Sequence, residues 1–373
     1  MKPQPTQPAA SQRLLSLDAL RGFDMLFIMG FASFVVAVCG LWPSAVTDAA
    51  AASMSHVAWD GFAHHDTIFP LFLFIAGVSF PYSVAKQRAG GMSEGRIYAK
   101  IVRRGLTLVV LGMVYNGLFK LDFENLRIAS VLGRIGLAWS IAAVLYLNFG
   151  VKTRAAIAVA VLAGYGALSA LVAAPDAAGA GPLTFEGNLA GYIDRQFLPG
   201  KLIYGSFDPE GLLSTVPAVV TAMLGMFTGE FVRRGDIRGG RKTLWMAAAA
   251  AALLAAGLAF SGVLPVNKKL WSSTFVCVVG AYSLGMFALF YYLIDVRGWR
   301  RWTLFFRVVG LNSITIYLAQ RIVGFGRISD FFLGGIASKC PEAVAAVISS
   351  AGYVAVCWLF LYFLYRKNVF LKV

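Results

Sequence analysis

The sequence predicts an all-α protein that crosses a membrane about ten times, as a polytopic membrane helix bundle. Hydrophobic residues make up 58% of the 373 residues and charged residues only 14%, whereas soluble domains are about a quarter charged. The mean hydropathy is +0.71. The apolar residues gather in stretches of about twenty, the length that crosses the hydrocarbon layer as a helix.

The predicted spans form a single transmembrane domain over residues 14–373, preceded by a tail at residues 1–13 that we expect to be disordered and cytosolic. The tail, MKPQPTQPAASQR, has no apolar run of the kind that a signal peptide carries. The spans are expected at residues 18–41, 67–86, 102–119, 128–149, 155–174, 212–232, 243–264, 271–294, 303–323 and 343–365.

The distribution of basic residues predicts how the bundle is oriented. With the N-terminus in the cytosol, 21 of the 33 Lys and Arg residues fall in inner segments and 9 in outer segments. This is the asymmetry that the positive-inside rule describes, so both termini are expected in the cytosol. The same asymmetry accounts for the net charge of +15, and we expect no nucleic-acid partner.

The four cysteines point to no metal site, because no zinc-type Cys and His spacing occurs. Cys277 and Cys357 fall inside predicted spans, where cysteine usually packs as a small apolar residue. Cys39 and Cys340 lie near the outer ends of their spans, which leaves a disulfide between them open.

Polar residues within spans are costly in hydrocarbon and usually face the bundle interior or water. In the first span, Asp18, Arg21 and Asp24 recur every three residues and share a helix face. They could neutralise one another, or Arg21 could contact a phosphate. Arg134 lies in the fourth span, and Asn312 begins a polar stripe in the ninth. Such a stripe serves either helix–helix hydrogen bonding or a polar crevice.

All three histidines lie within residues 56–65, in the first long outer segment. Imidazole exchanges protons near neutral pH and is also a nucleophile, although a histidine at a membrane edge is often only a helix cap. His56 is distinguished by Trp59, Asp60 and Asp66, which follow it. A carboxylate beside an imidazole fixes its tautomer and raises its basicity. Trp59 could stack on a sugar ring or anchor at the interface. His64 and His65 are expected in solvent or packing roles.

Two other outer segments carry polar residues, FDPEG and PVNKKLW. Asp208 and Glu210 of the first could bind hydroxyl or ammonium groups of an acceptor, or cap a helix, since an Asp before Pro is typical of a helix start. Lys268 of the second could contact a carbonyl oxygen or anchor the loop.

Six blocks occur in a fixed order along the chain: RLLSLDALRGFDMLFI, HVAWDGFAHHDTIFPLFLFIAGVS, LRIASVLGRIGLAW, FDPEGLLSTVPAVVTAMLG, PVNKKLWSSTFV and GLNSITIYLAQ. Together they resemble the heparan-α-glucosaminide N-acetyltransferase family, from Leu14 to about Gln320. The resemblance implies a multi-span acetyltransferase, often dimeric. It would take acetyl from cytosolic acetyl-CoA and deliver it to the amine of a terminal glucosamine on the far side of the membrane. From the resemblance we also expect a homodimer, and we expect the protein in a bacterial inner membrane. The positive-inside orientation places the His56 loop on the outer side.

The resemblance assigns the catalytic histidine to His56 and the carboxylate of the following block to Asp66. Basic residues suit the phosphates of coenzyme A, so Arg21, Arg103 and Arg104 are our candidates for the nucleotide end. Arg134 and Asn312 could line a crevice for the pantetheine arm. The predicted acceptor-binding residues are Trp59, Asp60, Asp208, Glu210, Asn267, Lys268 and Trp271.

Several alternatives stay open at this stage. An asparagine of the lysosomal member has no counterpart in the apolar end of the first span, which leaves room for another donor or acceptor. His56 could hold the acetyl group covalently, or act only as a base in a ternary complex, which we favour. The rival functions are a transmembrane O-acyltransferase of a polysaccharide or envelope glycan, an amino-sugar transporter, and a scaffold. A transporter usually shows symmetric halves with broken helices near the midplane.

Overall fold

A computed structural model describes residues 14–371, so the tail predicted to be disordered lies outside the described residues. The regular secondary structure of the described residues is helical apart from two isolated β-bridges, which confirms the all-α prediction. The α-helices are α1 (Leu15–Leu26), α2 (Ala32–Cys39), α3 (Ala45–Ala52), α4 (Ile68–Ala89), α5 (Glu94–Tyr115), α6 (Val131–Asn148), α7 (Val151–Leu171), α8 (Leu189–Phe197), α9 (Thr215–Arg233), α10 (Gly239–Ala259), α11 (Ser273–Phe290), α12 (Thr303–Leu311), α13 (Ser313–Ile322), α14 (Phe325–Ala337) and α15 (Glu342–Arg366). The π and 3₁₀ segments are η1 (Phe27–Phe31), η2 (His64–Asp66), η3 (Leu118–Lys120) and η4 (Tyr291–Val296).

Within the described chain, eight helices are long and apolar enough to cross a membrane, against the ten spans that we predicted. They cover Leu15–Cys39, Ile68–Ala89, Val131–Asn148, Val151–Leu171, Thr215–Arg233, Gly239–Ala259, Ser273–Val296 and Glu342–Arg366. Of the other two predicted spans, one corresponds to α5, which is long but carries several charges. The other is broken at Asn312, whose φ of −123° and ψ of 29° end α12 before α13 begins.

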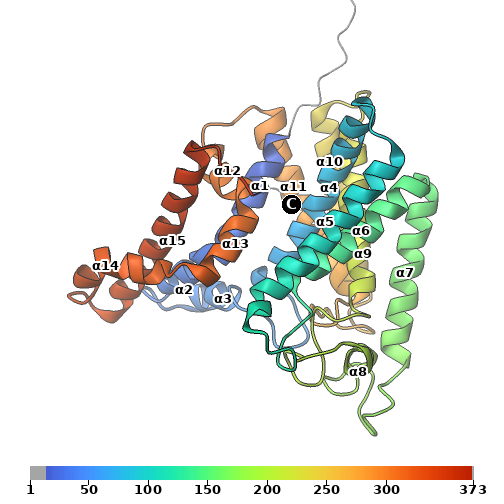
Figure 1. The fold of residues 1–373 in the computed structure, drawn as a ribbon, viewed down its shortest axis with the longest axis horizontal. Helices are drawn as coiled ribbons and strands as arrows, with labels where there is room; N and C mark the ends of the chain where they lie inside the picture. Colours follow the sequence, from blue (N-terminus) through green and yellow to red (C-terminus); the bar gives the residue numbers. More distant parts are fainter. Residues whose placement is uncertain (1–13, 372–373) are drawn as a thin grey trace, which may run out of the picture.

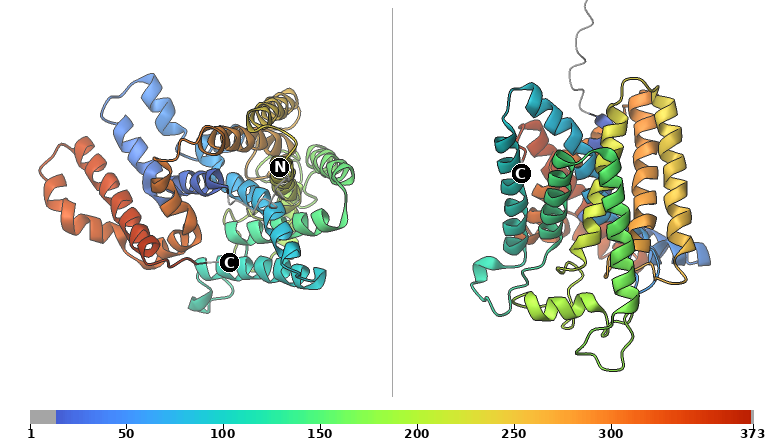
Figure 2. Two further views of the ribbon diagram at one scale, coloured as in Figure 1. Left: turned by 90° about the horizontal axis from the view of Figure 1, so that it is seen from above. Right: turned by 90° about the vertical axis from the view of Figure 1, so that its right-hand side faces the viewer.

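The helices form two groups around α1 and α4 (Figure 1). Helices α5 to α11 lie on one side, with α4 packed along α9, α5 along α6, and α10 along α11. Helices α12 to α15 lie on the other side together with α2, and α12 packs along α1. Figure 2 shows the same division from above, with the chain after α15 returning toward α5.

The two ends of the bundle differ in chemistry. Helix α1 starts at the end that also carries the basic connections at residues 86–96, 233–242 and 297–301, and we call it the basic end (Figure 1). The opposite end carries the longer connections at residues 40–66, 116–130, 172–214 and 260–272, and we call it the loop end. His56 therefore lies across the bundle from the start of α1.

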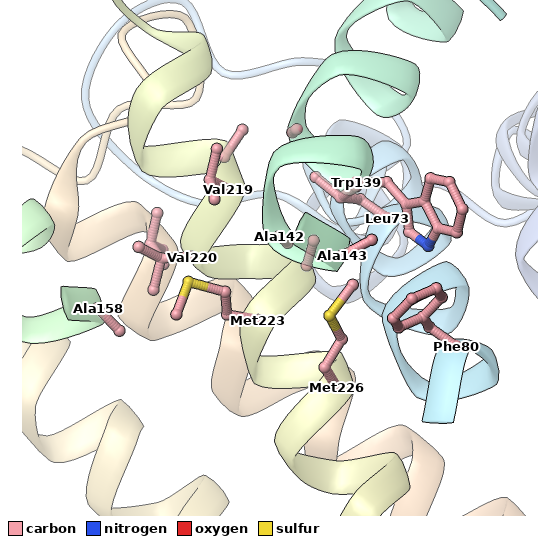
Figure 3. Close-up of a cluster of buried hydrophobic side chains, with 14 of the residues drawn as sticks. Leu73, Phe80, Trp139, Ala142, Ala143, Ala158, Val219, Val220, Met223 and Met226 are labelled. Carbon is pink, nitrogen blue, oxygen red and sulfur yellow. The ribbon is translucent and has the colours of Figure 1, made fainter. Parts of the chain in front are cut away.

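Small residues let the central helices approach closely. A Cβ atom on Gly225 of α9 would come 2.1 Å from the carbonyl oxygen of Phe74, and one on Gly77 of α4 would come 2.2 Å from that of Ala222. The core beside this crossing is packed by Leu73 and Phe80 of α4 and by side chains of α6 and α9 (Figure 3). Close backbone approach at small residues is a typical way for helices to associate in membranes. This close packing holds α4 in place, and α4 directly follows the segment that carries Asp66.

All four cysteines are free thiols, so Cys39 and Cys340 are not joined in this structure.

Candidate functional site

The site begins with a pair formed by His56 and Asp66. Asp66 closes the short 3₁₀ turn η2 just before α4, and only 2% of it is exposed. Its Oδ1 lies 2.8 Å from Nδ1 of His56, and its Oδ2 accepts the backbone N–H of Val57 at 3.3 Å. The His56 side chain is 52% exposed, so the ring is anchored at one nitrogen while its other edge reaches solvent.

The carboxylate settles which nitrogen of His56 carries the proton. Burial alone would raise the pKa of Asp66, but the hydrogen bond to His56 and the charge of Lys268 outweigh it, and the pKa of this carboxyl is lowered. An ionised oxygen 2.8 Å from Nδ1 requires a proton between the two atoms. Nδ1–H therefore donates to Asp66, and Nε2 is left with a lone pair that can accept a proton or attack a carbonyl.

Lys268 completes this centre from the connection between α10 and α11. Its Nζ lies 3.0 Å from Nδ1 and 3.4 Å from Nε2 of His56, and 3.5 Å from Oδ1 of Asp66. Burial lowers the pKa of Lys268, although Asp66 and Glu210 oppose the shift. The Asp66 carboxylate favours the charged form of Lys268, and its Nζ can donate to an oxygen that becomes negative beside the imidazole.

Backbone contacts join the two loops that carry these groups. Asp60 accepts the N–H of Val266 at 2.9 Å, and the N–H of Gly61 donates to the carbonyl of Val266 at 3.0 Å. Asn267 is fully buried and its side-chain oxygen accepts the N–H of Leu270. Asp60 thus holds the two loops together, whereas Asn267 stabilises the turn within its own loop. A role of either residue in binding an acceptor stays a prediction.

The other two histidines lie beside the pair. The ring of His65 packs against that of His56 with centroids 4.5 Å apart, and burial, followed by the charges of His56 and Lys268, lowers its pKa to about 4. The Nε2 of His64 lies 3.1 Å from the hydroxyl of Tyr282. Of the solvent and packing roles that we expected for these two histidines, their positions match packing.

The FDPEG segment is held by a group of charges that includes Arg127 and Asp194, two residues that our sequence analysis did not single out. Arg127 donates to both oxygens of Asp208 at 2.7 Å and also pairs with Glu210. Asp194 of α8 is fully buried and accepts the N–H groups of Asp208 at 3.1 Å and Leu212 at 2.9 Å. Burial raises the pKa of Asp194 to about 6. Asp208 is locked by these bonds, so Glu210 is the carboxylate of this segment with more freedom.

Arg134 and Trp271 lie next to one another, and Arg134 contacts the end of this segment at Gly211. Both are almost completely buried, with the guanidinium carbon of Arg134 5.0 Å from the ring centre of Trp271. Arg134 donates to the hydroxyl of Ser214, while its Nε and one terminal nitrogen have no protein partner within the described residues. Trp271 donates to Thr221 at 3.2 Å. Trp271 is therefore a buried support next to the site.

Trp59 belongs to an aromatic layer over the loop end. Its indole N–H donates to the carbonyl of Leu183 at 2.8 Å, and its ring packs against Phe185 and Phe207. Tyr204 extends this layer and carries the ammonium of Lys269 4.7 Å above its ring. The layer places aromatic rings beside the His56 loop.

A cavity of about 390 Å³ lies between the two helix groups and brings together two of the predicted coenzyme A residues, Arg21 and Arg104. Its walls come from α1, α4, α5, α6, α12 and α13. Phe69 lines the cavity and follows Asp66 by three residues, so the cavity reaches within one helical turn of the pair. The segment after α15 covers it with Phe370 and Leu371.

The other predicted coenzyme A residues lie outside the lining of this cavity. Arg103 is exposed and points to a different side of α5 from Arg104. Arg104 lines the cavity and also stacks over Trp139 at 4.3 Å. Asn312 is buried and donates to the carbonyl of Val369 at 3.2 Å. Arg134 is part of the buried group at the loop end. Among residues 14–371, no group of three His, Cys, Asp or Glu side chains is placed to hold a metal ion.

Known proteins resemble this chain along much of its length. A family profile described as heparan-alpha-glucosaminide N-acetyltransferase, catalytic, matches residues 13–262. The heparan-alpha-glucosaminide N-acetyltransferase of Homo sapiens is 27% identical over 375 residues, which cover 85% of this chain and 55% of the human protein. That of Mus musculus is 26% identical over 372 residues, which cover 85% of this chain and 56% of the mouse protein. The chain thus spans about half the length of these curated relatives. Because the profile covers well over half of its residues, the chain belongs to the heparan-α-glucosaminide N-acetyltransferase family.

Proposed function

We propose that this protein is a membrane-embedded acetyltransferase that moves acetyl from acetyl-CoA to the amine of a glucosamine-type sugar. The observation that carries the proposal is the His56–Asp66 pair, with its free Nε2 beside the ammonium of Lys268, one helical turn from the end of a cavity that holds Arg21 and Arg104. Family membership supports the same chemistry.

The donor fits the cavity in one orientation. Arg21 and Arg104 are cations and suit the phosphates of coenzyme A, and the rest of the lining is mostly apolar and suits a thin pantetheine arm. Phe69 marks the other end, next to the pair. With the basic end in the cytosol, as the positive-inside rule favours, the nucleotide stays inside. The thioester then reaches His56 at the outer face of an inner membrane.

The transfer follows from the proton positions. The acceptor nitrogen attacks the thioester carbonyl carbon while Nε2 of His56 takes a proton from that nitrogen. As the C–N bond forms, Asp66 stabilises the imidazolium and the ammonium of Lys268 faces the carbonyl oxygen as it becomes negative. When the C–S bond breaks, His56 returns the proton to the leaving sulfur. The products are the amide and the coenzyme A thiol.

The acceptor binds at the loop end in this proposal. Glu210 can accept a hydrogen bond from a hydroxyl group of an amino sugar, and the aromatic layer around Trp59 and Tyr204 can stack on its ring. Asp208, Asn267 and Trp271 hold these groups in place. A homodimer remains the expected assembly.

The test uses the purified chain in lipid nanodiscs with acetyl-CoA labelled in the acetyl group and a panel of amino sugars. Mass spectrometry should find an N-acetylated sugar and an equal amount of free coenzyme A, both lost in His56→Ala. A hydroxylamine-labile product would indicate an ester and favour the O-acyltransferase. Sugar uptake into vesicles without release of coenzyme A would favour the transporter, and either result would contradict the proposal.

The same preparation separates the two mechanisms. Rapid quenching without acceptor should show no labelled protein if His56 acts as a base. A stoichiometric acetyl-enzyme that disappears in His56→Ala would replace the ternary mechanism with a covalent one.

A further inference from the structure

A second cavity shares no lining residue with the first cavity or with the His56 site. This groove of about 380 Å³ is formed by α9, α10 and α11 and has Phe74 of α4 at its floor. Its lining is apolar except for Thr228. The three helices are all candidate membrane spans, so the groove opens into hydrocarbon, where an acyl chain is the natural occupant.

Two small residues create the depth of the groove. Ala249 of α10 is exposed and Gly280 of α11 has no side chain, and both line it. A Cβ at Gly280 would lie 2.8 Å from Leu224 and 3.6 Å from Leu253. Large side chains at these two positions would fill the space that an acyl chain would use.

The groove ends at a cluster of basic residues. Phe231 and Trp245 line it next to the connection at residues 233–242, whose sequence RRGDIRGGRK holds one acidic residue. Arg241 precedes Trp245 by four residues, and Trp245 precedes Ala249 by four, so the three share one face of α10. Arg238 stands one turn before Arg241, at the N-terminus of the helix.

Arg238 and Arg241 are the cations of this connection that are available to a ligand. Both are exposed, and neither forms an ion pair within the described residues. Arg234 pairs with Asp236 at 2.6 Å and Lys242 donates to the carbonyl of Val232 at 2.6 Å. Arg233 is exposed too, but its guanidinium lies over the ring of Tyr82, 5.7 Å from the ring centre.

We propose that this groove binds an anionic phospholipid of the leaflet at the basic end. One acyl chain would lie along Ala249 and Gly280, and the phosphate would bind Arg238 and Arg241. Trp245 stands between the two regions, where tryptophan is usually found at a membrane interface. Basic pockets between helices on the cytosolic side are known to bind anionic headgroups.

The purified, delipidated full chain tests this with phosphatidylglycerol, phosphatidylcholine and inorganic phosphate, read by native mass spectrometry and thermal shift. Phosphatidylglycerol should remain bound and raise the Tm, whereas the other two should not. We expect each arginine to contribute about a fivefold factor to the affinity for an anionic lipid. The double variant Arg238→Gln/Arg241→Gln should therefore weaken phosphatidylglycerol binding by about 25-fold. Ala249→Phe should abolish it.

The matched control is Arg96→Gln/Lys100→Gln, which removes two exposed charges from the same end of the bundle on α5. It should bind phosphatidylglycerol as the wild type does. The proposal is wrong if this control loses as much affinity as the arginine variant, if phosphatidylcholine binds equally well, or if Ala249→Phe still binds the lipid. None of these readouts depends on acetyl transfer.

Discussion

Asp66→Asn is the sharpest test of the proposed chemistry, because it keeps the size of the side chain and removes one charge. The carboxylate is 2% exposed and 2.8 Å from Nδ1 of His56, which becomes positively charged during the transfer. A hydrogen bond to a charged group contributes about 1.5–3 kcal/mol, and each 1.36 kcal/mol corresponds to a tenfold rate change. The kcat/KM should therefore fall by about 10- to 150-fold.

The backbone contact of Asp66 makes the expected loss larger. The carboxylate serves two donors, Nδ1–H of His56 and the N–H of Val57 at 3.3 Å. An asparagine has one acceptor oxygen, so one donor must face the amide NH₂. If that donor is His56, the imidazole adopts the tautomer with the proton on Nε2, and Nε2 can no longer act as the base. In a protease this exchange costs about 10⁴-fold, which sets the upper bound.

The assay is the initial rate of coenzyme A release in nanodiscs, measured at several acetyl-CoA concentrations. The KM for acetyl-CoA should stay close to that of the wild type, because Asp66 does not line the donor cavity. Asp48→Asn is the matched control, since Asp48 is an exposed carboxylate on α3 in the same loop-end segment. A folded Asp66→Asn protein with a kcat within twofold of the wild type would refute the reasoning.

Three further predictions concern the donor cavity, the histidine pair and the helix core. Arg21→Gln and Arg104→Gln should each raise the KM for acetyl-CoA by about tenfold and leave kcat unchanged, because tenfold corresponds to the low end of the free energy of a hydrogen bond to a charged group. A change in kcat alone would contradict the assigned site. His65→Ala should lower kcat more than His65→Phe, which keeps the ring packed on His56. Folding lowers the pKa of His65 from 6.5 to about 4, so between these pH values the unfolded chain holds one more proton than the folded chain. The wild-type Tm should therefore drop as the pH is lowered from 6.5 toward 4. His65→Phe should lessen that drop. Gly225→Val should cost about 1–3 kcal/mol of stability by overpacking, seen as a lower Tm, whereas Gly235→Val, with open space around the residue, should not.

The sequence made the membrane fold and the chemical type of the site predictable. Stretches of about twenty apolar residues suffice to define spans, and the unequal distribution of Lys and Arg suffices to suggest which end faces the cytosol. The motifs also pointed to His56 and Asp66, and the structure brings them within 2.8 Å. The two residues are only ten positions apart, so they belong to one short segment, and contacts of Asp60 and Gly61 with Val266 fix the shape of that segment.

The tertiary structure alone decided which polar groups share a site. Arg103 and Arg104 are neighbours in the sequence, yet only Arg104 lines the donor cavity, because consecutive residues point to different sides of a helix. Asp194 belongs to no motif, and its role as the anchor of the FDPEG segment arises because the connection folds back so that residues 208 and 212 bond to α8. Lys268 reaches His56 from 212 residues away. Apolar residues look alike whether they face lipid or another helix, so hydropathy cannot say which faces meet, and the cavity exists only where those faces meet.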